Sequence, residues 1–255
     1  LSLSKKQLSK GIYTASAGNF GLGVAIASKK IGVELKVFVP DTASQKKVEA
    51  LKKLGVGVNF LSFSEWWNIL ENHKQKGEEG VFLHPVANQA VLSGNATIGL
   101  EIMTQMPDVE AILVPFGGGG LITGIASIAK TINPNVKIFA CESQNALPLK
   151  AAFEAQEPRR VNMSPSFING IGSTIVLKDM WPLIKEVVDG TLSAGENKTK
   201  LTLKNLVVNN SIITEGAGAL PVACLDELKD QFKKVVCVVS GGNIDGATLS
   251  EIIGE

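Results

Sequence analysis

The 255-residue sequence has little of what several classes of protein require. Its three cysteines, Cys141, Cys224 and Cys237, are odd in number and far apart, so they predict neither a disulfide framework nor a zinc site. Only two histidines occur, and no Ser/His/Asp set suited to hydrolysis is evident. The net charge is +1, which gives no electrostatic case for binding nucleic acid or an anionic membrane. We therefore expect neither nucleic acid nor a membrane as a partner.

Two further features are missing. No apolar run is long enough to span a bilayer, and the polar first residues do not resemble a signal peptide. The sparse, scattered cysteines favour a reducing compartment. Together these absences predict a cytoplasmic protein.

Hydrophobic residues, by contrast, make up 45% of the sequence, enough for one large core or two modest ones. Apolar, β-branched runs alternate with segments of helical periodicity almost throughout. Strands are predicted at 11–15, 35–39, 57–61, 81–85, 111–115, 136–141 and 235–239. Helices are predicted at 20–31, 42–54, 64–75, 95–106, 121–130, 146–153, 181–188 and 217–228, with loops at 156–178 and an ambiguous segment at 194–208. This order predicts an α/β fold with parallel sheets and right-handed crossovers.

The stretch Thr14-Ala15-Ser16-Ala17-Gly18-Asn19-Phe20-Gly21 lies where a predicted strand turns into a predicted helix. Small residues and two glycines there let a ligand approach the backbone N–H groups closely. A plain helix cap is the alternative, with Ser16 or Asn19 accepting hydrogen bonds from the first helical turn. Both interpretations stay open on this stretch alone.

Two more glycine-bearing turns follow predicted strands, at Gly117–Gly120 and at Ser240–Asn243. In parallel sheets, ligands bind beyond the carboxyl ends of the strands, which is where all three turns fall. We therefore expect the three turns to serve one ligand.

The four glycines at Gly117–Gly120 stand directly before a predicted helix. Successive unhindered N–H groups and a helix N-terminus favour a dianionic phosphate, whereas the structural alternative is a flexible loop. No Lys-Ser/Thr ending of a P-loop follows, which disfavours a nucleoside triphosphate. Neither glycine stretch has the G-x-G-x-x-G spacing, so a nicotinamide cofactor is only a runner-up.

Three side chains complete the candidate set. The neutral Ser240 hydroxyl can hydrogen-bond a ring nitrogen, and Asn19 suits a phenolate-like oxygen or a carboxylate. Phosphate, aromatic oxygen and ring nitrogen are the three groups by which pyridoxal phosphate is held. As structural alternatives, Ser240 is a turn hydroxyl and Glu215 is an acidic residue favoured by the dipole of the helix that follows it.

Together these residues resemble the fold-type II pyridoxal-phosphate enzymes, specifically the serine/threonine dehydratase and serine racemase branch. The resemblance covers nearly the whole chain. Its motifs occur in the family's order and are Ser16–Gly21, His84-Pro85, Thr97–Ile102, Pro115–Leu121, Cys141–Ser143, Glu215–Gly218 and Ser240–Asn243.

The resemblance implies two parallel-sheet α/β domains of the tryptophan synthase β-like fold, with the cofactor between them. Residues 13–89 would form a smaller, mobile domain, and residues 1–12 and 90–255 a larger, cofactor-binding one. The homodimer is the family's common form. The implied pyridoxal-phosphate contacts are Asn19, Gly117, Gly118, Gly119, Gly120, Leu121, Gly170, Glu215, Ser240 and Gly241. The implied substrate contacts are Ser16, Ala17, Gly18 and Asn19.

The sequence also departs from the family's pattern. The family's Schiff-base lysine lies upstream of the Asn19 loop in a Ser-x-Lys-x-Arg-Gly type of motif, and none occurs here. We expect the N-terminal segment that carries this lysine to be missing, so the catalytic residue is unknown; the alternative is an inactive homologue. Of the branch's divalent-metal ligands, Glu142 and Ala146 match but Pro148 replaces an acid, so no metal is expected.

Racemases of the branch carry a serine directly before the loop's Gly-Asn, and this chain has Ala17 there. A racemase needs proton delivery on both faces of the Cα carbanion, which alanine cannot supply. The resemblance therefore implies a lyase of amino-acid metabolism. It would be a pyridoxal-phosphate ammonia-lyase converting a β-hydroxy amino acid such as L-serine or L-threonine to a 2-oxo acid and ammonia. A serine racemase is the alternative.

Overall fold

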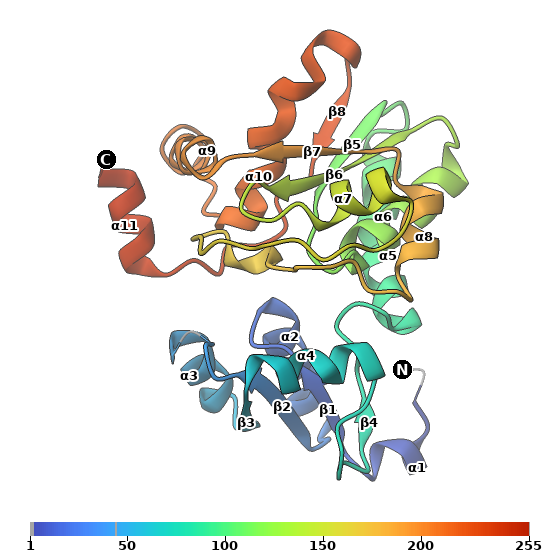
Figure 1. Cartoon of the computed structure of the whole chain (residues 1–255), viewed down its shortest axis with the longest axis vertical. Coiled ribbons are helices and arrows are strands. Elements are labelled where there is room, and N and C mark those ends of the chain that lie inside the picture. Colours follow the sequence, from blue (N-terminus) through green and yellow to red (C-terminus); the bar gives the residue numbers. More distant parts are fainter. Residues whose placement is uncertain (1–2, 44, 255) are drawn as a thin grey trace. The chain divides into compact units, whose positions relative to one another are not determined.

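The computed structural model describes residues 3–43 and 45–254, and the chain divides into two compact units, Leu1–Val91 and Leu92–Glu255 (Figure 1). Each unit has its own four-stranded parallel sheet, which confirms the predicted α/β class. Leu3, which precedes the short helix α1 (Lys5–Leu8), and Leu8, the last residue of that helix, pack against the core of the first unit. This placement differs from the expected grouping of residues 1–12 with the larger domain, because the apolar contacts of this segment lie in the first unit.

The sheet of the first unit has the order β3-β2-β1-β4. Its strands are β1 (Ile12–Ala15), β2 (Leu35–Pro40), β3 (Gly57–Leu61) and β4 (Val81–Phe82). Its helices are α2 (Asn19–Ile31), α3 (Gln45–Lys53) and α4 (Phe63–Asn72). Because the strands are parallel, their carboxyl ends lie at one edge, where the loop between β1 and α2 is found.

Both faces of this sheet are covered. Leu35, Val37 and Val39 alternate along β2 and point to the face where α2 and α3 contribute buried residues. Tyr13 points to the other face, where its ring stacks on Phe82. The α4 helix contacts this sheet and lies in front of it in Figure 1. Burial on both faces explains why β1 and β2 are apolar runs rather than alternating ones.

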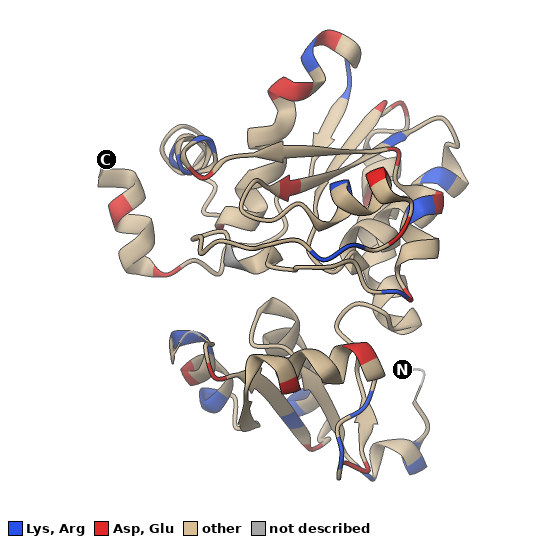
Figure 2. Cartoon of the chain, in the orientation of Figure 1, with Lys and Arg blue, Asp and Glu red and all other residues tan. Residues whose placement is uncertain are grey.

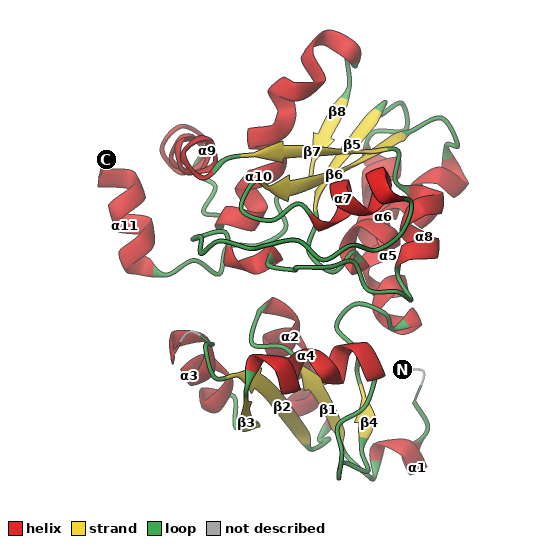
Figure 3. Cartoon of the chain, in the orientation of Figure 1, coloured by secondary structure: helices red, strands yellow, loops and turns green. Residues whose placement is uncertain are grey.

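The sheet of the second unit has the order β7-β6-β5-β8 (Figure 3). Its strands are β5 (Ala111–Pro115), β6 (Lys137–Ser143), β7 (Gly190–Ala194) and β8 (Val235–Cys237). Its helices are α5 (Gln89–Gln105), α6 (Gly120–Ile132), α7 (Pro148–Ala155), α8 (Trp181–Val187), α9 (Glu196–Asn210), α10 (Gly216–Cys224) and α11 (Gly246–Gly254). The boundary between the units falls in the first turn of α5. Two 3-10 segments lie at Asn169–Ile171 and Leu225–Gln231.

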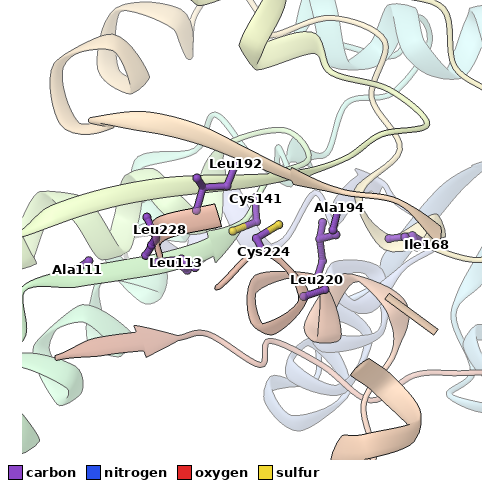
Figure 4. Packing of buried hydrophobic residues seen from close by; sticks show 10 residues of the cluster. Ala111, Leu113, Cys141, Ile168, Leu192, Ala194, Leu220, Cys224 and Leu228 are labelled. Carbon is purple, nitrogen blue, oxygen red and sulfur yellow. The ribbon is translucent and has the colours of Figure 1, made fainter. Parts of the chain in front are cut away.

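The core between this sheet and α10 contains the cysteines that are scattered in the sequence. Cys141 and Cys224 are fully buried together in it (Figure 4). Cys237 packs against this cluster. All three are free thiols. Burial raises the pKa of Cys141 well above its usual range and that of Cys237 to about 11. The thiols of Cys141 and Cys237 therefore stay neutral and act as small apolar side chains.

Positive and negative residues are interspersed along the helices and loops of both units (Figure 2). One partly buried network joins Asp189 to Lys130 at 2.7 Å and to Lys137 at 3.2 Å. Within residues 3–43 and 45–254, every helix is too short or too polar to cross a bilayer.

Candidate active site

The loop after β5 carries the four glycines and ends in the N-terminus of α6. Gly119 is the N-cap, with a φ of +90°, and a Cβ there would lie 2.5 Å from Ile184 Cδ1. No side chain caps α6, and no acidic residue lies in its first turn. The first amides of the helix therefore lack intrahelical acceptors and suit an anion.

A second segment, the 3-10 turn at Asn169–Ile171, lies directly against this loop. A Cβ on Gly117 would be 3.1 Å from Ile171 Cα. A Cβ on Gly170 would be 3.1 Å from the Cβ of Ala217 and 3.5 Å from Glu215 Oε1. The turn thus connects the glycine loop to the start of α10.

Glu215 is the N-cap of α10 and is buried. Its backbone N–H donates to the carbonyl oxygen of Gly241 at 2.9 Å. Ser240, directly before Gly241, is exposed. Because β8 pairs with β5 and Val238 N–H donates to Leu113 O at 2.9 Å, the turn after β8 lies at the same sheet edge as the glycine loop.

The contacts thus bring together the site residues that the sequence predicted in the second unit. Leu121 belongs to this set as the second residue of α6. The residues joined by these contacts, or adjacent in the chain to residues that are, are Gly117, Gly118, Gly119, Gly120, Leu121, Gly170, Glu215, Ser240 and Gly241.

In the first unit, the predicted substrate loop lies at the carboxyl end of β1. The Ser16 hydroxyl oxygen accepts from the N–H groups of Gly18 and Gly21, each at 3.3 Å. A Cβ on Gly21 would overlap the carbonyl oxygen of Ser16, so the loop closes tightly on itself. Asn19 is the exposed first residue of α2, and Gly18 provides no side-chain cap. Ser16 therefore has a structural role in the loop, while its O–H remains able to donate.

Glu142, the candidate metal ligand, lies at the end of β6 and is bound to backbone amides. Its carboxylate accepts from Leu149 N at 2.7 Å and from Lys150 N at 2.9 Å. Burial raises its pKa to about 7, although both amides oppose the shift. In the described part of the chain, no cluster of three His, Cys, Asp or Glu side chains could hold a metal ion.

One residue of this region was missed by the sequence reasoning. Thr214 is fully buried, and its hydroxyl donates to the Gly241 carbonyl oxygen at 2.8 Å. Its position directly before Glu215 was the available signal, but no periodicity marks it.

The second-unit residues fit pyridoxal phosphate. The uncapped N-terminus of α6 after Gly119 suits a dianionic phosphate, because no side chain competes for its amides. The exposed, neutral hydroxyl of Ser240 at the same sheet edge suits the pyridine nitrogen.

Comparisons with known proteins agree with this fit. The family model described as "Pyridoxal-phosphate dependent enzyme" matches residues 1–241. The chain is 34% identical over 254 residues to an L-threonine ammonia-lyase of Geobacter sulfurreducens, covering 98% of this chain and 63% of the relative. The chain therefore spans less than two thirds of that relative's length.

Two solved structures resemble the whole chain. Serine racemase from Dictyostelium discoideum has a TM-score of 0.85 and 33% identity, covering 96% of this chain and 80% of that one. The processed threonine deaminase isoform 2 of Solanum lycopersicum has a TM-score of 0.88 and 29% identity, covering 99% and 75%. Because the family model spans nearly all of the sequence and these relatives match at least 96% of it, the chain belongs to the pyridoxal-phosphate dependent enzymes, in their serine/threonine dehydratase and serine racemase branch.

Proposed function

We propose that this protein is an ammonia-lyase that converts a β-hydroxy amino acid such as L-serine or L-threonine to a 2-oxo acid and ammonia. The observation that carries the proposal is the continuous set of contacts from Gly117 through Gly170 and Glu215 to Gly241. It gathers a phosphate site and a neutral hydroxyl at one sheet edge. The match to an L-threonine ammonia-lyase supports the same reaction.

In this proposal, the amides of Gly117–Gly120 and of the first turn of α6 hold the cofactor's phosphate. The Ser240 hydroxyl hydrogen-bonds the ring nitrogen without placing a charge beside it, and Gly170 and Glu215 border the cofactor. Bound pyridoxal phosphate would supply an electron-withdrawing ring that stabilises negative charge at the substrate's Cα. A neutral partner at the ring nitrogen limits the build-up of negative charge at Cα. This limit favours loss of the β-hydroxyl over transamination.

The loop after β1 would serve the substrate. The Ser16 O–H and the amides of the loop donate to the substrate carboxylate, and Asn19 offers its amide to the cofactor's ring oxygen. The hydroxyl oxygen of Ser16 already accepts from Gly18 and Gly21, so the direction of its O–H is restricted. This preorganised donor set orients the substrate before a proton is removed from Cα.

Elimination is preferred to racemisation because of Ala17. Racemisation requires a group that returns a proton to the opposite face of Cα, and a methyl side chain cannot do so. A solved serine racemase does resemble this fold, so racemisation has to be measured beside elimination.

The test is incubation of the full-length protein, saturated with pyridoxal phosphate, with L-serine, L-threonine and other β-hydroxy amino acids. We expect 2-oxo acid and ammonia in equal amounts from at least one of them. D-serine formed faster than pyruvate would instead establish a racemase, and no product from any substrate would overturn both activities. Borohydride reduction followed by peptide mass spectrometry identifies the lysine that holds the cofactor, and the absence of a modified lysine would favour a non-catalytic homologue.

We further propose that the protein acts as a cytoplasmic homodimer without a bound divalent metal. The three free cysteines support a reducing compartment, and the binding of Glu142 to two backbone amides leaves it little capacity for a cation. Light scattering, cell fractionation and metal analysis of the purified protein test these three points.

A further inference from the structure

The carbonyl oxygen of Gly241 accepts two hydrogen bonds from the segment that leads into α10. The Thr214 hydroxyl donates at 2.8 Å and the Glu215 N–H at 2.9 Å. Thr214 is fully buried, so its side chain is fixed among its neighbours. The turn that carries Ser240 is therefore tied to α10 through a single oxygen atom.

Glycines make this approach possible. A Cβ on Gly218 would overlap Thr214 Oγ1 and would lie 2.9 Å from Gly241 O. A Cβ on Gly242 would lie 2.8 Å from the carbonyl oxygen of Ile213. The two segments are thus in backbone contact, and a rotation of the Gly241 peptide would break both hydrogen bonds.

Release of that carbonyl would also let Gly241 shift, and Ser240, which is bonded directly to Gly241, would shift with it. The carbonyl of Gly241 lies one residue beyond the exposed Ser240 side chain, and the paired strand β8 already ends at Cys237. The Thr214 hydroxyl lies 3.2 Å from the Glu215 carbonyl oxygen as well, but the shorter contact is to Gly241. A hydroxyl has one proton and donates one strong hydrogen bond at a time. The Thr214 hydroxyl therefore acts mainly on the turn that carries Ser240.

We propose that Thr214 is a positioning residue that acts through Gly241 to orient the Ser240 hydroxyl toward the ring nitrogen of the cofactor. The proposal rests on the function proposed above for Ser240. It assigns Thr214 no contact with substrate or cofactor. A positioning role differs from a purely structural one, because the effect of Thr214 on cofactor binding then depends on the presence of the Ser240 hydroxyl.

The experiment titrates full-length protein with pyridoxal phosphate and follows the absorbance band of the bound cofactor. Thr214→Val removes the hydroxyl and keeps the shape, and Thr214→Ser keeps the donor. We expect Thr214→Val to weaken pyridoxal-phosphate affinity about tenfold and to shift the band, and Thr214→Ser to stay within about twofold of wild type. Thr104→Val is the matched control, because that exposed hydroxyl donates to Leu100 O within α5.

A double-mutant cycle with Ser240→Ala separates positioning from stability. In the Ser240→Ala background, Thr214→Val should have no further effect on affinity or on the band. An equal loss in both backgrounds, or wild-type affinity in Thr214→Val, would overturn the proposal. If Thr214→Val melts below the assay temperature, Thr214→Cys replaces it under the same criteria. Wild-type protein that binds no pyridoxal phosphate would refute the proposed function itself, which is a different outcome from binding that is insensitive to Thr214.

Discussion

The carboxylate of Glu142 accepts a hydrogen bond of 2.7 Å from the backbone N–H of Leu149 in the first turn of α7. A second bond, of 2.9 Å, comes from Lys150 N. The first residue of α7 is Pro148, which has no N–H, so Glu142 satisfies the first two amides that the helix presents. Glu142 is 1% exposed, and burial outweighs these amides and raises its pKa from 4.5 to about 7.

The raised pKa of Glu142 predicts that stability falls as the pH rises from about 4.5 to about 7. In that interval the folded state retains a proton that the unfolded state has lost, so deprotonation favours unfolding. Above about 7 the carboxylate is ionised in both states and the contribution becomes constant. The full effect is up to about 3 kcal/mol. Urea unfolding at pH 5 and pH 8 measures it.

Glu142→Gln should flatten this pH dependence, because its side chain does not titrate. It should also lower stability at every pH, since a side-chain NH₂ would face the N–H of Lys150. Glu101→Gln, at an exposed position of α5, is the control and should keep the wild-type pH profile. A Glu142→Gln variant with an unchanged pH profile would contradict the assignment.

A second prediction concerns His84, which is buried at the end of the β4 segment. Its Nδ1 accepts from Val86 N and Ala87 N, both at 2.9 Å, and Nε2 lies 3.1 Å from Leu70 O. A neutral ring with its proton on Nε2 satisfies all three contacts. His84→Ala should therefore lower the free energy of unfolding by about 2–4 kcal/mol, because three backbone groups lose their partner.

His84→Asn is the matched variant, because an asparagine oxygen can accept from the amide two residues onward. It should recover part of the stability lost in His84→Ala. Thermal unfolding of the two variants beside wild type decides the point. Equal melting of His84→Ala and wild type would show that the contacts to Val86 and Ala87 contribute nothing.

Local patterns in the sequence predicted the elements that flank the site. β5 was predicted at its observed bounds, because a fully apolar run between turn residues has few other interpretations. α5 begins at Gln89, six residues before its predicted start, because the Asn88 side chain accepts from Ala90 N at 3.0 Å and caps the helix. β7 was not predicted, and only its last residue, Ala194, falls in the segment 194–208 that was ambiguous; its residues are mostly small or polar, and its pairing with β6 defines it.

Tertiary contacts explain what the sequence could not predict. α11 was not predicted, because its burial comes from Ile252 packing in the cluster that includes Leu203 of α9. The glycine turns could be located as strand ends, since parallel strands align their carboxyl edges. The hydrogen bond from Thr214 to Gly241 could not be predicted from the sequence, because it joins residues 27 positions apart in two segments without periodicity.

A third prediction contrasts two glycines of α5. Gly99 packs against α6, and a Cβ there would lie 2.5 Å from Ile125 O and would overlap the side chain of Ile128. Gly94 faces open space. Gly99→Ala should destabilise the protein by about 1–3 kcal/mol through overpacking, whereas Gly94→Ala should stabilise it by up to about 1 kcal/mol through helix propensity. Opposite shifts in the urea midpoint are expected, and shifts of the same sign would contradict the packing of α5 on α6.

A fourth prediction follows from Thr123, the fourth residue of α6. Its hydroxyl is buried and has no hydrogen-bond partner among the described residues. A buried hydroxyl without a partner costs about 1–3 kcal/mol of desolvation that folding does not recover. Thr123→Val removes the hydroxyl and keeps a β-branched side chain, so it should raise the free energy of unfolding by about 1 kcal/mol.

Thr131→Val is the control for Thr123→Val on the same helix. The exposed Thr131 hydroxyl donates to Ser127 O at 2.7 Å, and its removal should change stability by no more than about 0.5 kcal/mol. Chemical denaturation of both variants, with and without saturating pyridoxal phosphate, distinguishes two causes. Stabilisation in both conditions would establish an unsatisfied hydroxyl in the core. Destabilisation confined to the saturated protein would show that the Thr123 hydroxyl gains its partner only when the neighbouring glycine loop is occupied.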